Sequence, residues 1–293
     1  MSIVVTGASG FVGARLTAFL QSHGEQVVAL RRDGDVGQAL AGARCVVHLA
    51  ARVHVMKENA SNPLIEFRQV NVEASVNLAR QAAAAGVIRF VFISSVKVNG
   101  EQTSPNQPFT EDDDPCPEDD YGQSKHEAEL ALRQVALDTG LEVVIIRPPL
   151  VYGPRVKANF ASLMRAVERG WPLPLGAIQN ARSLVGVDNL VDFIDCCIKH
   201  PAAANQTFLV SDGHDVSSAE LVREMASAAG IRPNLWFVSP WLLQLGAALL
   251  GKRMAAQRLC GSLQVDISKS HLVLGWQPAV SLSEGLKRAF LKV

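Results

Sequence analysis

A tyrosine and a lysine four residues apart are the side chains of this sequence best suited to acid–base chemistry. In a helix, Tyr121 and Lys125 would lie one turn apart on the same face. A free tyrosine has a pKa of about 10 and is a poor base at neutral pH, but a nearby cation stabilises its phenolate. The spacing therefore predicts that Lys125 lowers the pKa of Tyr121, and that Tyr121 exchanges a proton with a substrate hydroxyl or carbonyl.

Small hydroxyl side chains reach the same region from a buried strand. Ser94 and Ser95 follow the apolar run that begins at Phe90. Ligands of open α/β sheets bind at the carboxyl ends of the strands. We expect Ser95 to donate a hydrogen bond to the oxygen that Tyr121 protonates, which makes Ser95, Tyr121 and Lys125 the predicted catalytic residues.

A glycine-rich loop near the start of the chain predicts a dinucleotide site. Gly7, Gly10 and Gly13 stand between the apolar run 3–6 and a helical segment, with G-x-x-G-x-x-G spacing. Glycines there let backbone amides approach a pyrophosphate at the helix N-terminus. The predicted contact residues are Gly7, Gly10, Phe11, Val12 and Gly13.

The next strand points to the choice between NAD and NADP. The run 27–30 ends at Arg31 and Arg32, where NAD-binding folds place an acidic residue, and no carboxylate follows until Asp33. Guanidinium groups suit the 2′-phosphate of NADP. We therefore predict NADP in preference to NAD; the alternative is two solvated arginines at a strand end.

Strands and helices alternate through the first half of the chain, which predicts a parallel sheet. The expected strands are Ile3–Thr6, Val27–Leu30, Cys45–Leu49, Phe90–Ser94 and Val143–Arg147. The predicted fold class is α/β, a Rossmann-type doubly wound sheet with a smaller C-terminal α/β substrate lobe. Residues 1–152 would form the dinucleotide-binding domain, catalytic residues included. Residues 153–293 would form mainly the second lobe, with about 182–200 returning to the first.

Composition narrows the partners and the compartment. Lysine and arginine number 28, as do aspartate and glutamate, so no net charge draws the chain to nucleic acid. Five cysteines without C-x-x-C spacing predict no disulfide framework and no zinc, and hence a cytoplasmic protein. The acidic runs 112–114 and 118–120 are interpreted as solvated, and no metal is expected. No transmembrane segment is expected either: the apolar stretch 236–251 is interpreted as a buried or lid-forming helix, with a monotopic membrane contact as the alternative.

The motifs together resemble those of the extended short-chain dehydrogenase/reductase family, in particular its nucleotide-sugar epimerases, dehydratases and ketoreductases. The matching segments, in chain order, are Thr6 to Gly13, His48 to Ala51, Asn71, Ser94-Ser95, Tyr121 to Lys125, Arg147 to Pro154, Arg182 to Leu190 and Leu274 to Pro278. The resemblance implies that Leu49, Ala50, Ala51, Asn71 and Pro148 also contact the cofactor.

The same resemblance implies how the second lobe would bind its substrate. Asn159 and Arg182, with Arg258 as a looser match, fall at the positions that bind a nucleotide diphosphate, which the resemblance implies is UDP-linked, and Lys97 would lie close to the sugar. Helices near 72–83 and 126–135 would pair in a homodimer.

Departures from the family pattern reduce the number of candidate reactions. Dehydratases of the family place Asp-Glu after the catalytic Ser or Thr, whereas Val96 and Lys97 stand there, so dehydration is not expected. A reductase of a UDP-4-keto-6-deoxy-N-acetylhexosamine in O-antigen (lipopolysaccharide) biosynthesis is placed ahead of a UDP-sugar 4-epimerase, because Arg31 and Arg32 favour NADPH. Two further alternatives are a non-catalytic NADP-binding sensor or scaffold and a reductase of a small aldehyde or ketone.

Overall fold

The computed structural model describes residues 1–53, 63–104, 106–249 and 259–291. Its main sheet contains six parallel strands in the order β2-β1-β3-β4-β5-β8. The strands are β1 (Ser2–Thr6), β2 (Val27–Leu30), β3 (Ala43–His48), β4 (Arg89–Ile93), β5 (Glu142–Arg147) and β8 (Thr207–Leu209). Strand order reverses at β1, which lies between β2 and β3, and ligands of such sheets bind at this reversal.

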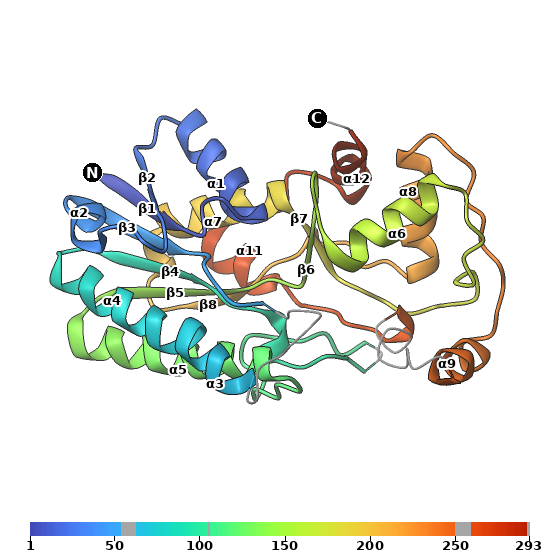
Figure 1. Ribbon diagram of the computed structural model, residues 1–293, viewed down its shortest axis with the longest axis horizontal. Helices are drawn as coiled ribbons and strands as arrows, with labels where there is room; N and C mark the ends of the chain where they lie inside the picture. Colours follow the sequence, from blue (N-terminus) through green and yellow to red (C-terminus); the bar gives the residue numbers. More distant parts are fainter. Residues whose placement is uncertain (54–62, 105, 250–258, 292–293) are drawn as a thin grey trace.

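Helices cover both faces of the sheet (Figure 1). One face packs against α1 (Phe11–Ser22), α7 (Val187–Lys199) and α11 (Ser268–Leu274), and the other against α2 (Val36–Leu40), α4 (Ala74–Ala84) and α5 (Asp120–Thr139). Alternation along β1 explains the two cores, because Ile3 and Val5 face the first set of helices and Val4 faces the second. The fold class expected from the sequence is confirmed.

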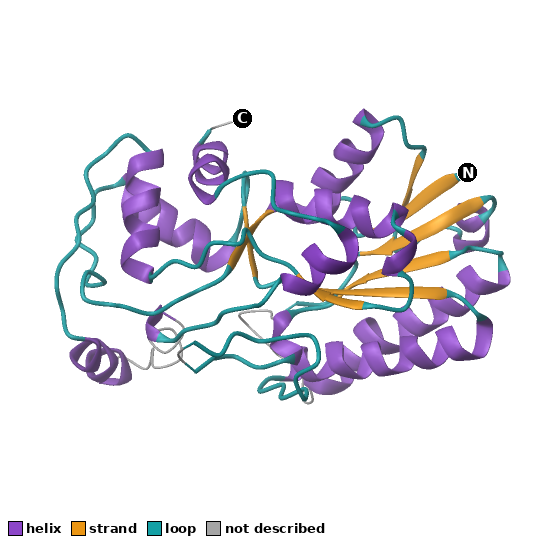
Figure 2. Cartoon of the chain, turned by 180° about the vertical axis from the view of Figure 1, so that it is seen from behind, coloured by secondary structure: helices purple, strands orange, loops and turns teal. Residues whose placement is uncertain are grey.

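A smaller lobe lies at the carboxyl end of the main sheet (Figure 2). It contains the two-stranded parallel sheet of β6 (Leu150–Tyr152) and β7 (Leu184–Gly186), together with α6 (Ala158–Glu168), α8 (Ser218–Ala228), α9 (Pro240–Leu249) and α12 (Leu282–Phe290). Its core includes Tyr152, Phe160, Met225 and Leu286. The boundary between residues 152 and 153 stays a prediction, and α7 and β8, which follow it, pack on or join the main sheet.

Short helices complete the connections. They are α3 (Pro63–Phe67), the π-helix η1 (Arg68–Glu73), and the 3₁₀ turns η2 (Val96–Val98) and η3 (Pro201–Ala203). The sequence predicted a helix near 72–83, but the residues up to Glu73 form η1 and α4 begins at Ala74. The spacing of apolar residues does not distinguish an α-helix from a short π-helix. π-Helical turns are often found at functional sites.

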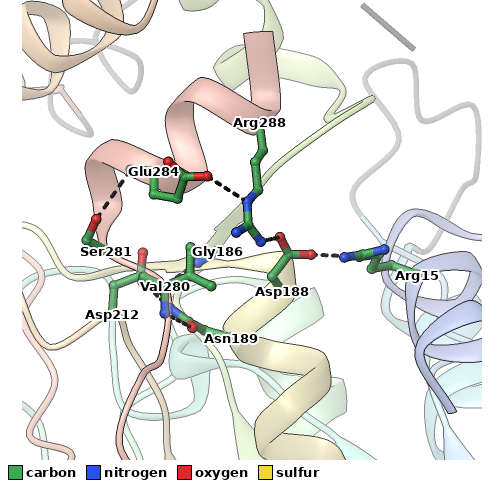
Figure 3. Close-up of polar contacts among 9 residues, drawn as sticks. All are labelled: Arg15, Gly186, Asp188, Asn189, Asp212, Val280, Ser281, Glu284 and Arg288. Carbon is green, nitrogen blue, oxygen red and sulfur yellow. Dashed lines mark hydrogen bonds and ion pairs between the residues drawn. The ribbon is translucent and has the colours of Figure 1, made fainter. Parts of the chain in front are cut away.

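An ion-pair junction joins the first domain to the C-terminal helix (Figure 3). Asp188 of α7 accepts hydrogen bonds from Arg15 of α1 at 2.6 Å and from Arg288 of α12 at 2.8 Å. Burial acts to raise the pKa of Asp188, but the bonds from both guanidinium groups outweigh it and hold the pKa below its usual value. The next residue, Asn189, exchanges two hydrogen bonds with the backbone of Val280.

Candidate active site

The glycine loop folds back on itself between β1 and α1. Gly7 has a φ of +65°, and a Cβ there would meet the Ala50 amide nitrogen at 2.9 Å. A Cβ on Gly13 would lie 2.1 Å from the Gly7 carbonyl oxygen, so this helical turn must carry glycine. Gly10 is the N-cap of α1 and supplies no side-chain cap. The helix therefore begins with amide groups available to an anion, and the loop fits a dinucleotide pyrophosphate.

A buried polar cluster fixes the neighbouring turn after β3. The Thr6 hydroxyl oxygen accepts hydrogen bonds from the amides of Leu49 (3.2 Å) and Ala50 (3.1 Å). The His48 ring bonds to the Thr6 hydroxyl at 2.8 Å and to the Ser75 hydroxyl at 2.9 Å. Burial, with the charge of Lys125, lowers the pKa of His48 to about 3. His48 is thus a neutral structural group, and it holds Leu49 and Ala50 beside the glycine loop.

The other residues implied for the cofactor differ in exposure. Phe11, Val12, Leu49, Ala50 and Ala51 are partly exposed along this edge of the sheet. Asn71 is 1% exposed, and its side chain exchanges two hydrogen bonds with the Arg52 backbone and donates another to Ser124. Asn71 therefore ties the turn after β3 to α5.

Two further cofactor positions lie at the ends of β2 and β5. Arg31 and Arg32 are exposed, and neither guanidinium forms an ion pair within the described part of the chain. Pro148 is buried, and its carbonyl oxygen accepts a hydrogen bond from the Val96 amide at 3.0 Å. That bond fixes η2 against the end of β5.

The two serines after β4 have different surroundings. Ser94 is buried and donates to Glu129 at 2.5 Å, within an ion pair formed by Glu129 and Arg147, whose side chains are 2% and 3% exposed. Ser95 is partly exposed, and its hydroxyl accepts a hydrogen bond from the Lys97 amide at 3.2 Å. The Ser94 hydroxyl is engaged in the core, which favours Ser95 as the serine that meets a substrate.

Helix α5 presents a stripe of functional groups to the end of β4. Tyr121, Lys125 and Glu129 repeat every four residues and so share one face of the helix. The Lys125 ammonium donates to the carbonyl oxygen of Ile93 at 2.7 Å and lies 4.2 Å from the centre of the Phe92 ring. Burial lowers the pKa of Lys125 to about 7, although the charge of Glu129 acts to raise it.

Tyr121 stands in the first turn of α5, with its ring edge-on to Phe67 at 6.2 Å between centroids. Burial, followed by the charge of Asp119, raises the pKa of Tyr121 above its usual value. The sequence predicted the opposite direction, from a cation at Lys125. That prediction was wrong for the protein alone, because burial of the phenol, together with the charge of Asp119, raises the pKa of Tyr121.

Lys97 forms ion pairs with two carboxylates beside Tyr121. Its ammonium contacts Glu101 at 2.5 Å and also contacts Asp119, and the Lys97 side chain is 25% exposed. The Asp119 carboxylate in turn accepts the Gly122 amide at 2.7 Å, which caps α5. The sequence interpretation of the run 118–120 as solvated acids was wrong for Asp119.

The family model described as the NAD-dependent epimerase/dehydratase family matches residues 3–211. The chain is also 50% identical to a UDP-glucose 4-epimerase of Vibrio cholerae, over 99% of this chain and 96% of that protein. The chain belongs to the NAD-dependent epimerase/dehydratase family. It is an extended short-chain dehydrogenase/reductase, an enzyme family that uses nicotinamide dinucleotides.

Two further proteins are similar to this chain along nearly its whole length. The N-acetyl-α-D-glucosaminyl-diphospho-ditrans,octacis-undecaprenol 4-epimerase of Escherichia coli O157:H7 is 29% identical over 98% of this chain and 93% of that protein. The structure of MoeE5 in complex with UDP-glucose and NAD has a TM-score of 0.78 and 25% identity, and covers 99% of this chain and 97% of that one. Both lobes therefore have counterparts in the family.

The resemblance assigned three residues to the diphosphate of the substrate. Two of them lie in the second lobe, and the third lies outside the described residues. Asn159 is exposed in the first turn of α6. Arg182 is partly exposed and donates to the Gly261 carbonyl oxygen at 3.0 Å. Arg258 lies outside the described residues. The substrate roles of all three remain predictions.

The remaining sequence expectations concern the surface and the cysteines. All five cysteines are free thiols. Within the described ranges, no helix is long and apolar enough to cross a bilayer. Helix α9, from the apolar stretch 236–251, exposes Trp241 and Leu245 by 62% and 52%. These side chains contradict a buried helix, whereas the lid-forming helix that the sequence also allowed stays a prediction.

Functional residues that the sequence interpretation missed include Asp119 and the Thr6–His48 pair. An acidic residue three positions before Gly122 is a recognisable N-cap signal, so Asp119 could have been identified from the sequence. The Thr6–His48 hydrogen bond joins residues that are 42 positions apart in the chain, so no local sequence pattern could predict it.

Proposed function

We propose that this protein is a 4-epimerase of a UDP-hexose, with UDP-glucose or UDP-N-acetylglucosamine as substrate. The observation that carries the proposal is the 50% identity with the Vibrio cholerae UDP-glucose 4-epimerase over 96% of that protein, which includes the substrate lobe. The second relative is also named as a 4-epimerase of a diphosphate-linked sugar. This reverses the order that the sequence favoured, in which the reductase came first.

Tyr121 would act as the acid and base at the C4 oxygen of the sugar. Its position in the first turn of α5, at the carboxyl edge of the sheet, suits proton exchange with a bound hydroxyl. Ser95 would donate to the same oxygen, since its neighbour Ser94 is engaged with Glu129. A bound nicotinamide supplies hydride acceptance and return.

Lys125 would provide a positive charge that varies near neutral pH. With its pKa at about 7, the Lys125 ammonium is close to half protonated under physiological conditions. A proton on Lys125 would stabilise negative charge on the Tyr121 oxygen one turn away. Burial, which raises the pKa of Tyr121, makes such a compensating charge necessary.

The cofactor would bind along the edge formed by the glycine loop and the turn after β3. Gly7, Gly10 and Gly13 would admit the pyrophosphate, and Leu49 to Ala51 would border the adenosine side. Pro148 would contact the nicotinamide amide. Arg31 and Arg32 would contact the ribose end; they are exposed there and suit a 2′-phosphate.

Substrate binding would fall to the second lobe. Asn159, Arg182 and Arg258 would hold the UDP diphosphate, because planar guanidinium groups bind phosphate oxygens bidentately. The chain has no net charge to attract an anion, so these local groups must supply the binding.

A 4-ketoreductase of a UDP-4-keto-6-deoxy-N-acetylhexosamine is the second candidate. Arg31 and Arg32 favour it, because a net reductase consumes NADPH and these guanidinium groups are free of ion pairs in the described residues. The two reactions use the same catalytic residues and differ in whether hydride returns to the sugar from which it came.

The assembly and the cellular role are further parts of the proposal. We propose a homodimer through α4 and α5, since α5 exposes Leu130 and Leu137 by 55% and 81%. A cytoplasmic role in lipopolysaccharide biosynthesis is proposed because the Escherichia coli relative is named for a diphospho-undecaprenol sugar.

A product assay separates the two candidates. Purified protein is incubated with UDP-glucose or UDP-N-acetylglucosamine, the sugars are resolved by chromatography, and reduced nicotinamide is followed by its absorbance. An epimerase forms the C4 epimer without net change in the absorbance. Stoichiometric NADPH oxidation with a UDP-4-keto-6-deoxy-N-acetylhexosamine, without epimer formation, would support the reductase instead. Tyr121→Phe should lose at least about 100-fold in kcat in the active assay while still binding the dinucleotide.

A further inference from the structure

Lys97 connects the turn that carries Ser95 to the helix that carries Tyr121. Its backbone amide donates to the Ser95 hydroxyl at 3.2 Å, and its ammonium contacts Asp119, the N-cap of α5. Through these contacts a single residue reaches both proposed catalytic positions.

The start of α5 packs closely against Lys97. The Asp119 carboxylate accepts the Gly122 amide at 2.7 Å, in the first turn of α5 and next to Tyr121. A Cβ on Gly122 would lie 2.9 Å from the Lys97 carbonyl oxygen, so the helix start approaches the η2 backbone as closely as only glycine allows. Side-chain and backbone contacts of Lys97 therefore converge on the same helix turn.

We propose that Lys97 is a positioning residue that sets Ser95 and Tyr121 at a fixed separation, and that it acts through Asp119 instead of binding the sugar. The inference rests on the proposed function only in assigning Ser95 and Tyr121 to one substrate oxygen. It replaces the sugar contact that the family resemblance implied for Lys97, since the ammonium already contacts the Glu101 and Asp119 carboxylates.

The charged groups around Tyr121 allow the effect of Lys97 to be measured through the pKa of Tyr121. Lys97 of η2 and the following Glu101 face Asp119, and Glu118 accepts the Glu101 amide at 3.4 Å. Asp120 and Lys125 belong to α5 itself. Arg52 pairs with Glu66 and lies over the ring of Phe67, which contacts Tyr121. Burial is the main cause of the raised pKa of Tyr121, and the charge of Asp119 raises it further. Lys97 offsets the charge of Asp119.

The kinetic test compares Lys97→Met with Lys97→Arg in the holoenzyme. Lys97→Met should lower kcat by about 10- to 100-fold with little change in KM, because catalytic groups displaced by a fraction of an ångström lose rate while binding persists. Lys97→Arg should recover most of the loss. Lys269→Met is the matched control, since Lys269 pairs with Glu111 at 3.6 Å and its side chain is 24% exposed against 25% for Lys97. A raised KM with unchanged kcat in Lys97→Met would overturn the proposal in favour of a sugar contact.

A second readout needs no substrate. The chain has two tyrosines, so ζ-¹³C-labelled tyrosine gives two NMR signals, and Tyr121→Phe assigns them. In the holoenzyme, Lys97→Met should move the Tyr121 ionisation to higher pH, and Lys97→Met/Asp119→Asn should return it toward wild type, because asparagine still caps the helix without the charge. Unchanged Tyr121 ionisation in Lys97→Met would overturn the inference. If the signal shifts but the wild type epimerises no UDP-hexose, the proposed function fails and this inference stands.

Discussion

The Lys125 ammonium nitrogen lies 2.7 Å from the Ile93 carbonyl oxygen and 4.2 Å above the Phe92 ring, in a side chain that is only 2% exposed. A charge in such surroundings loses most of its hydration and recovers one hydrogen bond and a ring contact. The buried ammonium therefore costs stability, as the account expects of a residue proposed to act in catalysis.

Lys125→Met should stabilise the protein and remove turnover. Because the folded-state pKa of Lys125 is about 7 and the usual value is 10.5, the unfolded chain binds more protons between these pH values, and wild-type stability should rise with pH across that window. Lys125→Met should thus increase the free energy of unfolding most at and below pH 7, by about 1–4 kcal/mol. This increase should vanish near pH 10.5.

Urea unfolding at several pH values measures this difference. Lys199→Met serves as the control, since the Lys199 side chain is 44% exposed and pairs with Asp195 at the surface. A variant at position 125 that is less stable than wild type at pH 7 would show that Lys125 contributes to folding.

Glu129→Gln should destabilise the domain by about 3–5 kcal/mol, because it leaves the Arg147 guanidinium buried without its counter-charge. The same substitution at Glu284, whose side chain is 48% exposed beside Arg288, should change stability by less than about 0.5 kcal/mol. Equal losses in urea unfolding at the two sites would contradict the buried-pair interpretation.

Gly13→Ala should weaken dinucleotide binding by about 10- to 100-fold, the equivalent of one charge-assisted hydrogen bond. The added methyl group would lie 2.1 Å from the Gly7 carbonyl oxygen and must displace the loop. Gly246→Ala in α9 introduces the same group where no described atom beyond the adjacent residues and the helix's own backbone lies within 4 Å. Isothermal titration with NAD and NADP gives both affinities; undiminished binding by the first variant would place the pyrophosphate elsewhere.

Replacing Arg31 and Arg32 by alanine should lower NADP affinity by about tenfold or more and leave NAD affinity unchanged, since charged hydrogen bonds to the 2′-phosphate would be lost. Arg232→Ala removes an exposed guanidinium from the second lobe and should alter neither. Should both dinucleotides weaken together, the arginines would have a structural role.

The local patterns of the sequence predicted the five strands and the glycine loop, because these depend on residue periodicity and on backbone conformations that glycine permits. The sequence patterns could not predict the contacts formed where α5 packs against η2 and β5. Lys97 and Asp119 are 22 residues apart and Glu129 and Arg147 are 18 apart, and nothing in either neighbourhood specifies the partner.

The spacing of Tyr121 and Lys125 illustrates the same limit. It placed a cation one turn from a phenol, but the carbonyl that binds this cation belongs to Ile93, 32 residues earlier. The sequence patterns also could not predict the reaction, because the proposed catalytic residues Ser95, Tyr121 and Lys125 would serve an epimerase and a reductase alike. Similarity over the whole chain favours the epimerase.

Transfer of the C4 hydrogen tests the central claim most directly. UDP-glucose carrying deuterium at C4 is incubated with the enzyme and its bound dinucleotide, and both hexoses are examined by NMR and mass spectrometry. A 4-epimerase yields UDP-galactose that retains deuterium at C4, with no hydrogen gained from solvent and no net reduced cofactor. Unconverted UDP-glucose, together with deuterium transfer from 4-deuterated NADPH to a UDP-4-keto-6-deoxy-N-acetylhexosamine, would contradict the epimerase and establish the reductase.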